Sequence, residues 1–172
     1  MSRLPGRVVY NAETIERRVR GLAEEIACAY GADDRLLLLG VLKGSFVFLA
    51  DLVRALEIPV QVDFLVVSSY GDAMVSSGEV RFEYLARAPL AGRSILLVED
   101  IVDTGRTLDQ VVPLLLERGA RSVEICALLH KRRASSRYEP RFVGFEAPDD
   151  FLVGYGLDHA EDFRQLPYVA SL

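Results

Sequence analysis

The feature that most constrains the fold is an apolar run followed at once by acids, a glycine turn and a helical pattern, over residues 94–107 and beyond. The run is short and aliphatic, as in a strand buried on both faces of a parallel sheet. Glu99, Asp100 and Asp103 follow it, and apolar residues then recur at helical spacing. The carboxylates therefore lie on a strand-to-helix turn, at the sheet edge where open α/β folds bind ligands. Because a helix N-terminus offers N–H donors, the stretch suits a ligand with hydroxyls and a phosphate.

Two more stretches show a similar order. The first has a strand, a turn and a helix, and the second has a strand followed by a turn. Residues 36–42 are aliphatic apart from one glycine and run into Lys43-Gly44-Ser45, after which a helical spacing begins. This second turn is either a simple helix cap or a second anion site. Residues 123–129 form another apolar strand that ends in a basic run. The alternation predicts an α/β fold with a mainly parallel, twisted sheet and helices on both faces.

The length predicts a single domain over residues 1–172. We expect its core over about residues 12–135. The C-terminal part shows only short extended pieces, so we expect a small hood over about residues 136–172, together with the N-terminal residues. A polar, glycine-bounded hairpin connection at about residues 68–79 has the length of a flexible active-site loop. Pro113 predicts a kink in the helix after the acidic turn, because proline lacks an N–H and clashes with the preceding turn.

Composition and charge exclude several classes of protein. The 172 residues are 51% hydrophobic, which is enough for a well-filled core, and the net charge of -5 argues against a nucleic-acid partner. We find no signal-peptide pattern, and the longest aliphatic run is far shorter than the roughly 18 residues of a membrane span. We therefore expect a cytoplasmic protein with no membrane contact. Cys28 and Cys126 are expected to be buried thiols, and no cysteine or histidine spacing suggests zinc.

The clustered acids allow three chemistries on residue type alone. They could bind a divalent metal, accept hydrogen bonds from sugar hydroxyls, or supply the acid of an aspartic-protease-like site through Asp103-Thr104-Gly105. The protease interpretation fails, because it needs two such segments facing one another in an all-β frame. Metal binding and sugar binding both stay open.

Residues 98–107 closely resemble the phosphoribosyl-pyrophosphate motif of the type I phosphoribosyltransferases. Asp103 gives this motif the form found in the hypoxanthine-guanine, or 6-oxopurine, branch, in its short bacterial type. The resemblance covers residues 36–168 and is also carried, in the family's order, by Leu42–Ser45, Ser69–Tyr70, Lys131–Arg132, Pro148–Asp158 and Phe163–Arg164. His159 departs from the pattern, because a tyrosine is more usual there.

The resemblance implies a Mg²⁺-dependent enzyme that transfers phosphoribosyl from 5-phosphoribosyl 1-pyrophosphate to N9 of a 6-oxopurine. Hypoxanthine or guanine would give IMP or GMP and pyrophosphate, in purine salvage. The resemblance also implies a homodimer or homotetramer. The alternative is an RNA-binding regulator of the pyrimidine-operon type on the same fold, against which both the acidic net charge and Asp103 count. The choice among hypoxanthine, guanine and xanthine stays open.

The resemblance further implies roles for the acidic turn. Asp103 would be the catalytic residue and would take or share the N7 proton of the purine. Glu99 and Asp100 would accept hydrogen bonds from the ribose hydroxyls. The 5′-phosphate would be held by Asp103, Thr104, Gly105, Arg106 and Thr107.

The remaining roles fall on other segments. Pyrophosphate would be bound by the loop Leu42, Lys43 and Gly44, which in the family often carries a cis peptide, and by Arg164. The purine would be bound by Lys131 at O6, by stacking on Phe151, by the backbone of Leu152 and near Asp158. Magnesium would be held by Glu99, Asp100 and Asp158. Ser69 and Tyr70 would belong to the flexible loop that excludes water.

Overall fold

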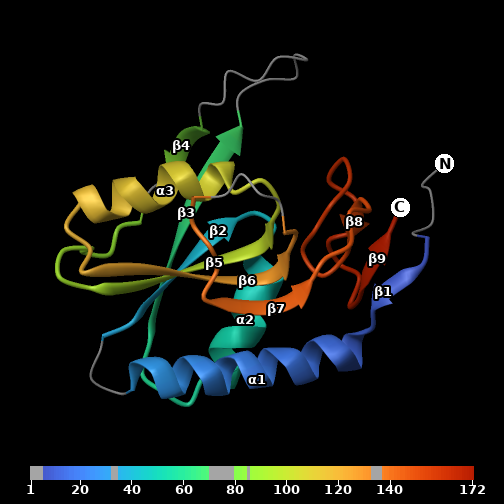
Figure 1. Cartoon of the computed structure of the whole chain (residues 1–172), viewed down its shortest axis with the longest axis horizontal. Coiled ribbons are helices and arrows are strands. Elements are labelled where there is room, and N and C mark those ends of the chain that lie inside the picture. Colours follow the sequence, from blue (N-terminus) through green and yellow to red (C-terminus); the bar gives the residue numbers. More distant parts are fainter. Residues whose placement is uncertain (1–5, 32–34, 70–79, 85, 133–136) are drawn as a thin grey trace.

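A computed structural model of the chain describes residues 6–31, 35–69, 80–84, 86–132 and 137–172 (Figure 1). Its main element is a six-stranded sheet in the order β4-β3-β2-β5-β6-β7. The strands are β2 (Leu37–Leu42), β3 (Gln61–Ser69), β4 (Val80–Tyr84), β5 (Ser94–Val102), β6 (Ser122–His130) and β7 (Phe142–Glu146). All pairs are parallel except that between β3 and β4 at one edge. The predicted α/β fold with a mainly parallel sheet is confirmed.

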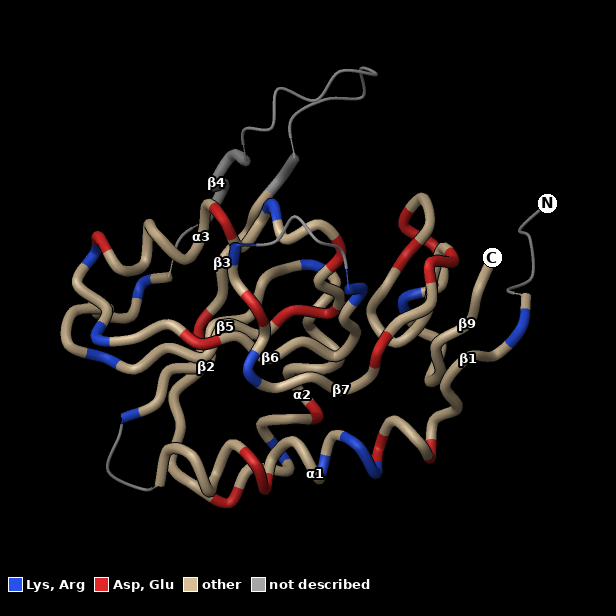
Figure 2. Tube along the Cα trace, in the orientation of Figure 1, with Lys and Arg blue, Asp and Glu red and all other residues tan. Residues whose placement is uncertain are grey.

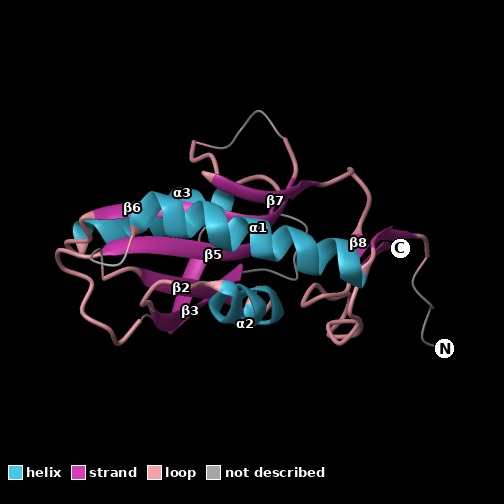
Figure 3. Ribbon diagram, turned by 90° about the horizontal axis from the view of Figure 1, so that it is seen from below, coloured by secondary structure: helices cyan, strands magenta, loops and turns pink. Residues whose placement is uncertain are grey.

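Three helices cover the two faces of this sheet, as predicted. They are α1 (Ala12–Tyr30), α2 (Phe46–Ala55) and α3 (Arg106–Glu117). Helices α1 and α2 pack side by side on one face, and α3 lies on the other (Figures 1 and 3). The side chain of Asn11 caps α1 by accepting a hydrogen bond of 2.8 Å from the N–H of Thr14.

The burial of β5 on both faces explains why residues 95–98 are continuously apolar. Leu96 and Val98 belong to the core that α1 and α2 cover, whereas Ile95 and Leu97 belong to the core that α3 covers. Successive side chains of a strand point to opposite faces, so a strand with helices on both sides must be apolar at every position. The same burial fixes β5 in the centre of the sheet.

A second sheet of three antiparallel strands lies beyond the carboxyl ends of β5, β6 and β7 (Figure 1). Its strands are β1 (Val8–Tyr10), β9 (Val169–Ser171) and β8 (Leu152–Val153). The N-terminal strand thus pairs with the C-terminal one. This sheet places the loop between β8 and β9 next to the strand ends from which ligands are bound in such folds.

The boundary expected for the hood lies close to β7. We expected it from about residue 136, but β7 pairs with β6 in the main sheet. Arg18 of α1 also donates hydrogen bonds of 2.9 and 2.6 Å to the carbonyls of Gly144 and Val143. No helical pattern precedes β7 in the sequence, so nothing marked it as the next parallel strand.

The expectations for the two cysteines and for Pro113 have different outcomes. Cys126 is buried, but Cys28 is exposed, because it lies about 200° around α1 from the buried Ile26. Helix α3 continues through Pro113 as one element, and the predicted kink stays a prediction. Within the described ranges, no helix has the length and apolar character that crossing a membrane requires.

Candidate active site

The strand order reverses between β2 and β5, and this reversal positions the site. The chain leaves β2 toward α2 on one face and leaves β5 toward α3 on the other (Figure 1). The two strands are parallel neighbours, with Gly40 paired to Val98. Their turns therefore diverge at one edge of the sheet, the place where open α/β folds have their ligand-binding crevice.

The turn after β5 carries the acids. Glu99 and Asp100 are still within β5, and Asp103 comes directly after it. Gly105 has φ 75°, a left-handed conformation that favours glycine, and is the N-cap of α3. It makes no side-chain hydrogen bond to the helix. Gly105 thus supplies no capping side chain of its own to the first turn of α3, and a helix N-terminus of this kind can bind an anion.

The turn after β2 lies directly against these acids. The Leu42–Lys43 peptide is cis, as the family resemblance implied. A Cβ added to Gly44 would lie 1.8 Å from Oδ2 of Asp100. Only glycine therefore allows the loop to approach β5 this closely. Ser45 is not a side-chain cap of α2, since its hydroxyl donates instead to the carbonyl of Val41 at 2.7 Å.

The loop between β8 and β9 packs on top of the turn after β2. A Cβ on Gly156, which has φ 101°, would lie 2.1 Å from the carbonyl oxygen of Gly44. Arg164 donates to the carbonyl of Gly156 at 2.8 Å and pairs with Asp158 at 2.7 Å. The structure thus brings Gly44, Asp158 and Arg164 together.

The turn after β6 completes the other side of the crevice. The backbone N–H of Lys131 donates to the carbonyl of Val102 at 2.9 Å, so Lys131 lies beside the start of the acidic turn. Its buried ammonium donates to the carbonyl of Asp150 at 3.0 Å, directly before Phe151. Phe151 is 56% exposed, which leaves its ring available to a planar ligand. The adjacent Leu152 is buried, and its backbone pairs with Ser171.

The two acids of β5 are electrostatically unusual. Burial, and then the neighbouring Asp100, raise the pKa of Glu99 well above its ordinary value. Burial raises the pKa of Asp100 to about 6, with backbone hydrogen bonds and Arg164 opposing the shift and Asp158 adding to it. A buried carboxylate beside a half-buried one, with Arg164 as the cation that opposes the shift of Asp100, favours binding of an added positive charge.

These acids do not form a preformed metal cage. Among the residues that the structure describes, no group of three or more His, Cys, Asp or Glu side chains could hold a metal ion. The expected ligands Glu99, Asp100 and Asp158 therefore do not form a complete metal site by themselves. Magnesium commonly binds through one or two carboxylates, with waters and substrate phosphates as its other ligands. The donor chemistry of Asp100 and Glu99 fits that mode.

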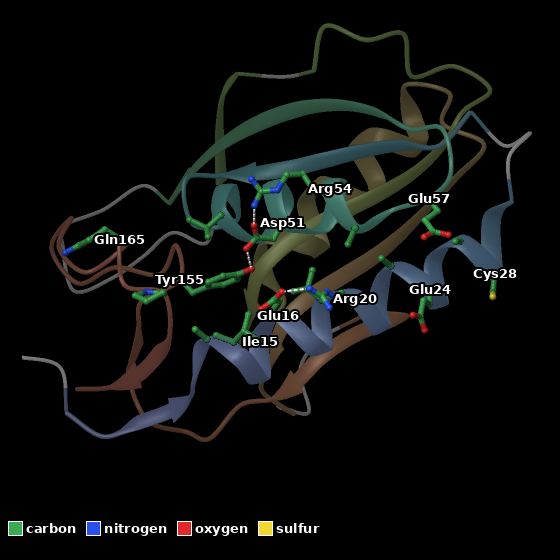
Figure 4. A pocket seen from close by; sticks show the side chains of 17 residues that line it. Ile15, Glu16, Arg20, Glu24, Cys28, Asp51, Arg54, Glu57, Tyr155 and Gln165 are labelled. Atoms are coloured by element: carbon green, nitrogen blue, oxygen red, sulfur yellow. Dashed lines mark hydrogen bonds and ion pairs between the residues drawn. The ribbon is translucent and has the colours of Figure 1, made fainter.

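A large groove lies elsewhere, between α1 and α2 (Figure 4). It has a volume of about 1010 Å³ and contains none of the predicted site residues. Tyr155 reaches it from the loop that carries Asp158, and its hydroxyl donates to Oδ2 of Asp51 at 2.5 Å. The groove is therefore separate from the predicted site.

Known proteins match this chain along most of its length. The sequence model of the phosphoribosyl transferase domain matches residues 8–160. The hypoxanthine-guanine phosphoribosyltransferase of Bacillus subtilis is 44% identical over 169 residues, which is 96% of this chain and 92% of the relative. Its counterpart in Aquifex aeolicus is 43% identical over 164 residues, with 95% and 92% covered. A crystal structure of the Staphylococcus aureus hypoxanthine phosphoribosyltransferase superposes with a TM-score of 0.92 at 36% identity, covering 98% of this chain and 91% of that one.

The chain belongs to the phosphoribosyltransferase family. The similarity to its hypoxanthine-guanine branch, predicted from the motif at residues 98–107, is confirmed. The relatives carry the names of enzymes, so the RNA-binding alternative is not favoured.

Three contacts near the predicted site of this phosphoribosyltransferase were not predicted from its sequence. Glu161 lies within 3.1 Å of Lys43, His159 packs edge-on against Phe151 at 5.4 Å between ring centroids, and Tyr155 binds Asp51. Only the spacing of Glu161, three residues after Asp158 and three before Arg164, hinted at such a role.

Some predicted members of the phosphoribosyltransferase site cannot be placed. Tyr70 lies outside the described residues, and Ser69 is the last residue of β3, with its side chain not described. The expected flexible loop at about residues 68–79 falls on the same part of the chain. Its closure over the site stays a prediction.

Proposed function

We propose that this phosphoribosyltransferase transfers phosphoribosyl from 5-phosphoribosyl 1-pyrophosphate to N9 of a 6-oxopurine, hypoxanthine or guanine, in purine salvage in the cytoplasm. The observation that carries the proposal is the hydrogen bond of 2.9 Å between the N–H of Lys131 and the carbonyl of Val102. It joins the backbone of Lys131, the residue expected to bind O6, to Val102, which directly precedes Asp103, the acid expected to bind the N7 proton. This pairing of donor and acceptor matches the edge of a 6-oxopurine and not that of adenine.

The sugar phosphate would bind at the turn after β5. Glu99 and Asp100 would accept hydrogen bonds from the ribose hydroxyls. The backbone N–H groups and hydroxyls of residues 104–107 would surround the 5′-phosphate, favoured by the positive end of α3. Lys43, Gly44 and Arg164 would hold the diphosphate, since Gly44 lies against Asp100 and Arg164 against Asp158.

Formation of the bond between the purine and the ribose would then depend on the positions of the two reactants and on a proton transfer. N9 attacks C1 of the ribose while the bond from C1 to the diphosphate oxygen breaks, and the diphosphate leaves with the electron pair. Asp103 takes or shares the N7 proton as positive charge develops on the purine. Phe151 stacks on the base, and the backbone of Leu152 reads its edge.

Magnesium would be held by Asp100 with Glu99 or Asp158, together with the substrate. When bound, it supplies positive charge that stabilises the diphosphate as a leaving group. The raised pKa values of Glu99 and Asp100 support this assignment, because an added dication relieves the repulsion between neighbouring carboxylates.

The test is release of inorganic diphosphate by the purified protein. Phosphoribosyl pyrophosphate and Mg²⁺ are supplied with hypoxanthine, guanine, xanthine or adenine in parallel. We expect release with hypoxanthine or guanine and at least about 100-fold less with adenine, as for a polar edge left unpaired. No release with any 6-oxopurine, or preference for adenine, would refute the proposal.

The assembly state is a separate part of this proposal. We expect a homodimer or homotetramer, as the family resemblance implies. Light scattering during size-exclusion chromatography measures the mass directly, and a mass near that of one 19.1 kDa chain would contradict the expectation.

A further inference from the structure

The two cations expected to bind diphosphate both contact one carboxylate, that of Glu161. The ammonium of Lys43 lies 3.1 Å from each of its two oxygens. Arg164 lies 3.5 Å from one of them. Glu161 belongs to none of the motifs that carry the family resemblance and is an addition to the site.

The loop holds Glu161 in this position. Its backbone N–H donates to Oδ2 of Asp158 at 2.9 Å, and its φ of 67° turns the chain at this point. Asp158 is itself paired with Arg164 at 2.7 Å. A glutamate is ordinarily ionised at neutral pH, so this residue is an anion held beside two cations.

We propose that Glu161 occupies the diphosphate position as an internal anion, and that the diphosphate of the substrate displaces it from Lys43. The inference rests on the proposed function, because it takes Lys43 and Arg164 as diphosphate ligands. A carboxylate offers oxygens to an ammonium much as a phosphate does, so the two anions compete for the same donors. Glu161 thereby sets how tightly the site holds diphosphate.

The displacement is easy because the ion pair is open to water. Both side chains, Lys43 and Glu161, are 65% exposed. Exposed pairs of this kind change an equilibrium by a factor of about two to five. Glu161 should therefore weaken diphosphate binding by about that factor, and its return to Lys43 should speed dissociation of the product.

The test is titration calorimetry with inorganic diphosphate and Mg²⁺, comparing the unaltered protein with Glu161→Gln. The substitution keeps the size of the side chain and removes its charge. We expect the dissociation constant to fall about two- to five-fold at low salt and the gain to shrink at high salt, where exposed charges are screened. The KM for hypoxanthine should stay unchanged.

Two further variants separate the causes. Glu13→Gln removes another exposed, ion-paired carboxylate, on α1, and controls for net charge. We expect it to leave the dissociation constant unchanged. In a Lys43→Gln background, Glu161→Gln should tighten binding less than in the unaltered protein, because the ion pair is already broken.

The outcomes distinguish this inference from the proposed function. Unchanged or weaker binding by Glu161→Gln, or equal tightening with and without Lys43, would overturn the role of Glu161 alone. If the unaltered protein neither binds diphosphate nor releases it in the assay with 6-oxopurines, the proposed function fails as well.

Discussion

At the scale of single residues, the purine end of the site depends on how Lys131 uses its protons. An ammonium group has three donors. The carbonyls of Asp150 and Asp149, at 3.0 and 3.4 Å, are the acceptors that the described part of the chain provides for it. One donor is therefore left for a purine O6. The same contacts tie Lys131 to the segment that presents Phe151.

Replacing Lys131 by Gln should weaken the use of 6-oxopurines selectively. A hydrogen bond to a charged group contributes about 1.5–3 kcal/mol, which corresponds to a loss of about 10- to 150-fold in kcat/KM. The affinity for phosphoribosyl pyrophosphate should change little. Steady-state kinetics with hypoxanthine measures both, and Arg17→Gln on the exposed side of α1 is the control of equal charge change. An unaltered kcat/KM would remove Lys131 from the purine site.

The residues that the sequence predicts for the site share one property: each lies in a contiguous segment whose pattern is visible in the sequence. The acids, the glycine turn and the helix start occupy residues 99–107, and Lys43-Gly44 follows directly on β2. Glu161 and Lys43, by contrast, lie 118 residues apart, and Tyr155 and Asp51 lie 104 apart. Nothing in a local pattern brings such pairs together, because they meet only when the loop after β8 folds onto the turn after β2.

At the scale of the elements, the loop between β8 and β9 is also held by a contact with α2. Tyr155 is buried, and its hydroxyl donates to Asp51 of α2, which also pairs with Arg54 (Figure 4). Burial and Asp51 raise the pKa of Tyr155, so it remains a donor at neutral pH. Since α2 starts right after Lys43-Gly44-Ser45, this bond fixes the loop between β8 and β9 relative to the diphosphate turn.

Replacing Tyr155 by Phe should therefore cost both stability and substrate affinity. Losing a hydrogen bond to a charged acceptor costs about 1.5–3 kcal/mol of unfolding free energy when it is buried, and Asp51 is only partly buried, so we expect about 1 kcal/mol. Urea denaturation measures it, and the KM for phosphoribosyl pyrophosphate should rise in the same variant. Asp51→Asn combined with Tyr155→Phe should lose little more than either alone. Fully additive losses would show that the two side chains act independently.

The elements themselves were predictable where burial dictates the pattern. β2, residues 95–98 of β5 and residues 125–129 of β6 lack polar side chains because helices cover both faces, and α1 shows its cap in Asn11. β7 was not predictable as part of the main sheet. It is short, and its place is set by pairing with β6 and by Arg18 rather than by a crossover helix visible in the pattern.

At the scale of the whole molecule, negative charge predominates, although the proposed substrate is a polyanion. The net charge is -5, and Figure 2 shows acids in the loop between β8 and β9 as well as at the end of β5. Under the proposed function, binding of phosphoribosyl pyrophosphate would therefore depend on a few local cations and on added magnesium rather than on a general positive field. A ligand that joins both turns should also hold the two sheets together.

Ligand binding should therefore raise the melting temperature. At a ligand concentration 100 times Kd, binding to the folded state alone adds about 2.7 kcal/mol, which corresponds to about 5–10 °C for a chain of this size. We expect this shift with phosphoribosyl pyrophosphate and Mg²⁺ together, and a smaller one after chelation of the metal. Ribose 5-phosphate, which lacks the diphosphate, is the matched control ligand. An equal shift with both ligands would argue against a diphosphate site at Lys43 and Arg164.

The central claim is that Asp103, on the turn that joins β5 to α3, faces the chemistry while its neighbours hold the sugar phosphate. Asp103→Asn tests it most directly, through kcat and the dissociation constant of phosphoribosyl pyrophosphate measured on the same preparation. General base catalysis contributes about 100-fold or more, so kcat should fall by at least that factor while the dissociation constant changes less than about three-fold. A parallel loss of turnover and binding would contradict the claim and leave Asp103 as a structural part of the phosphate turn.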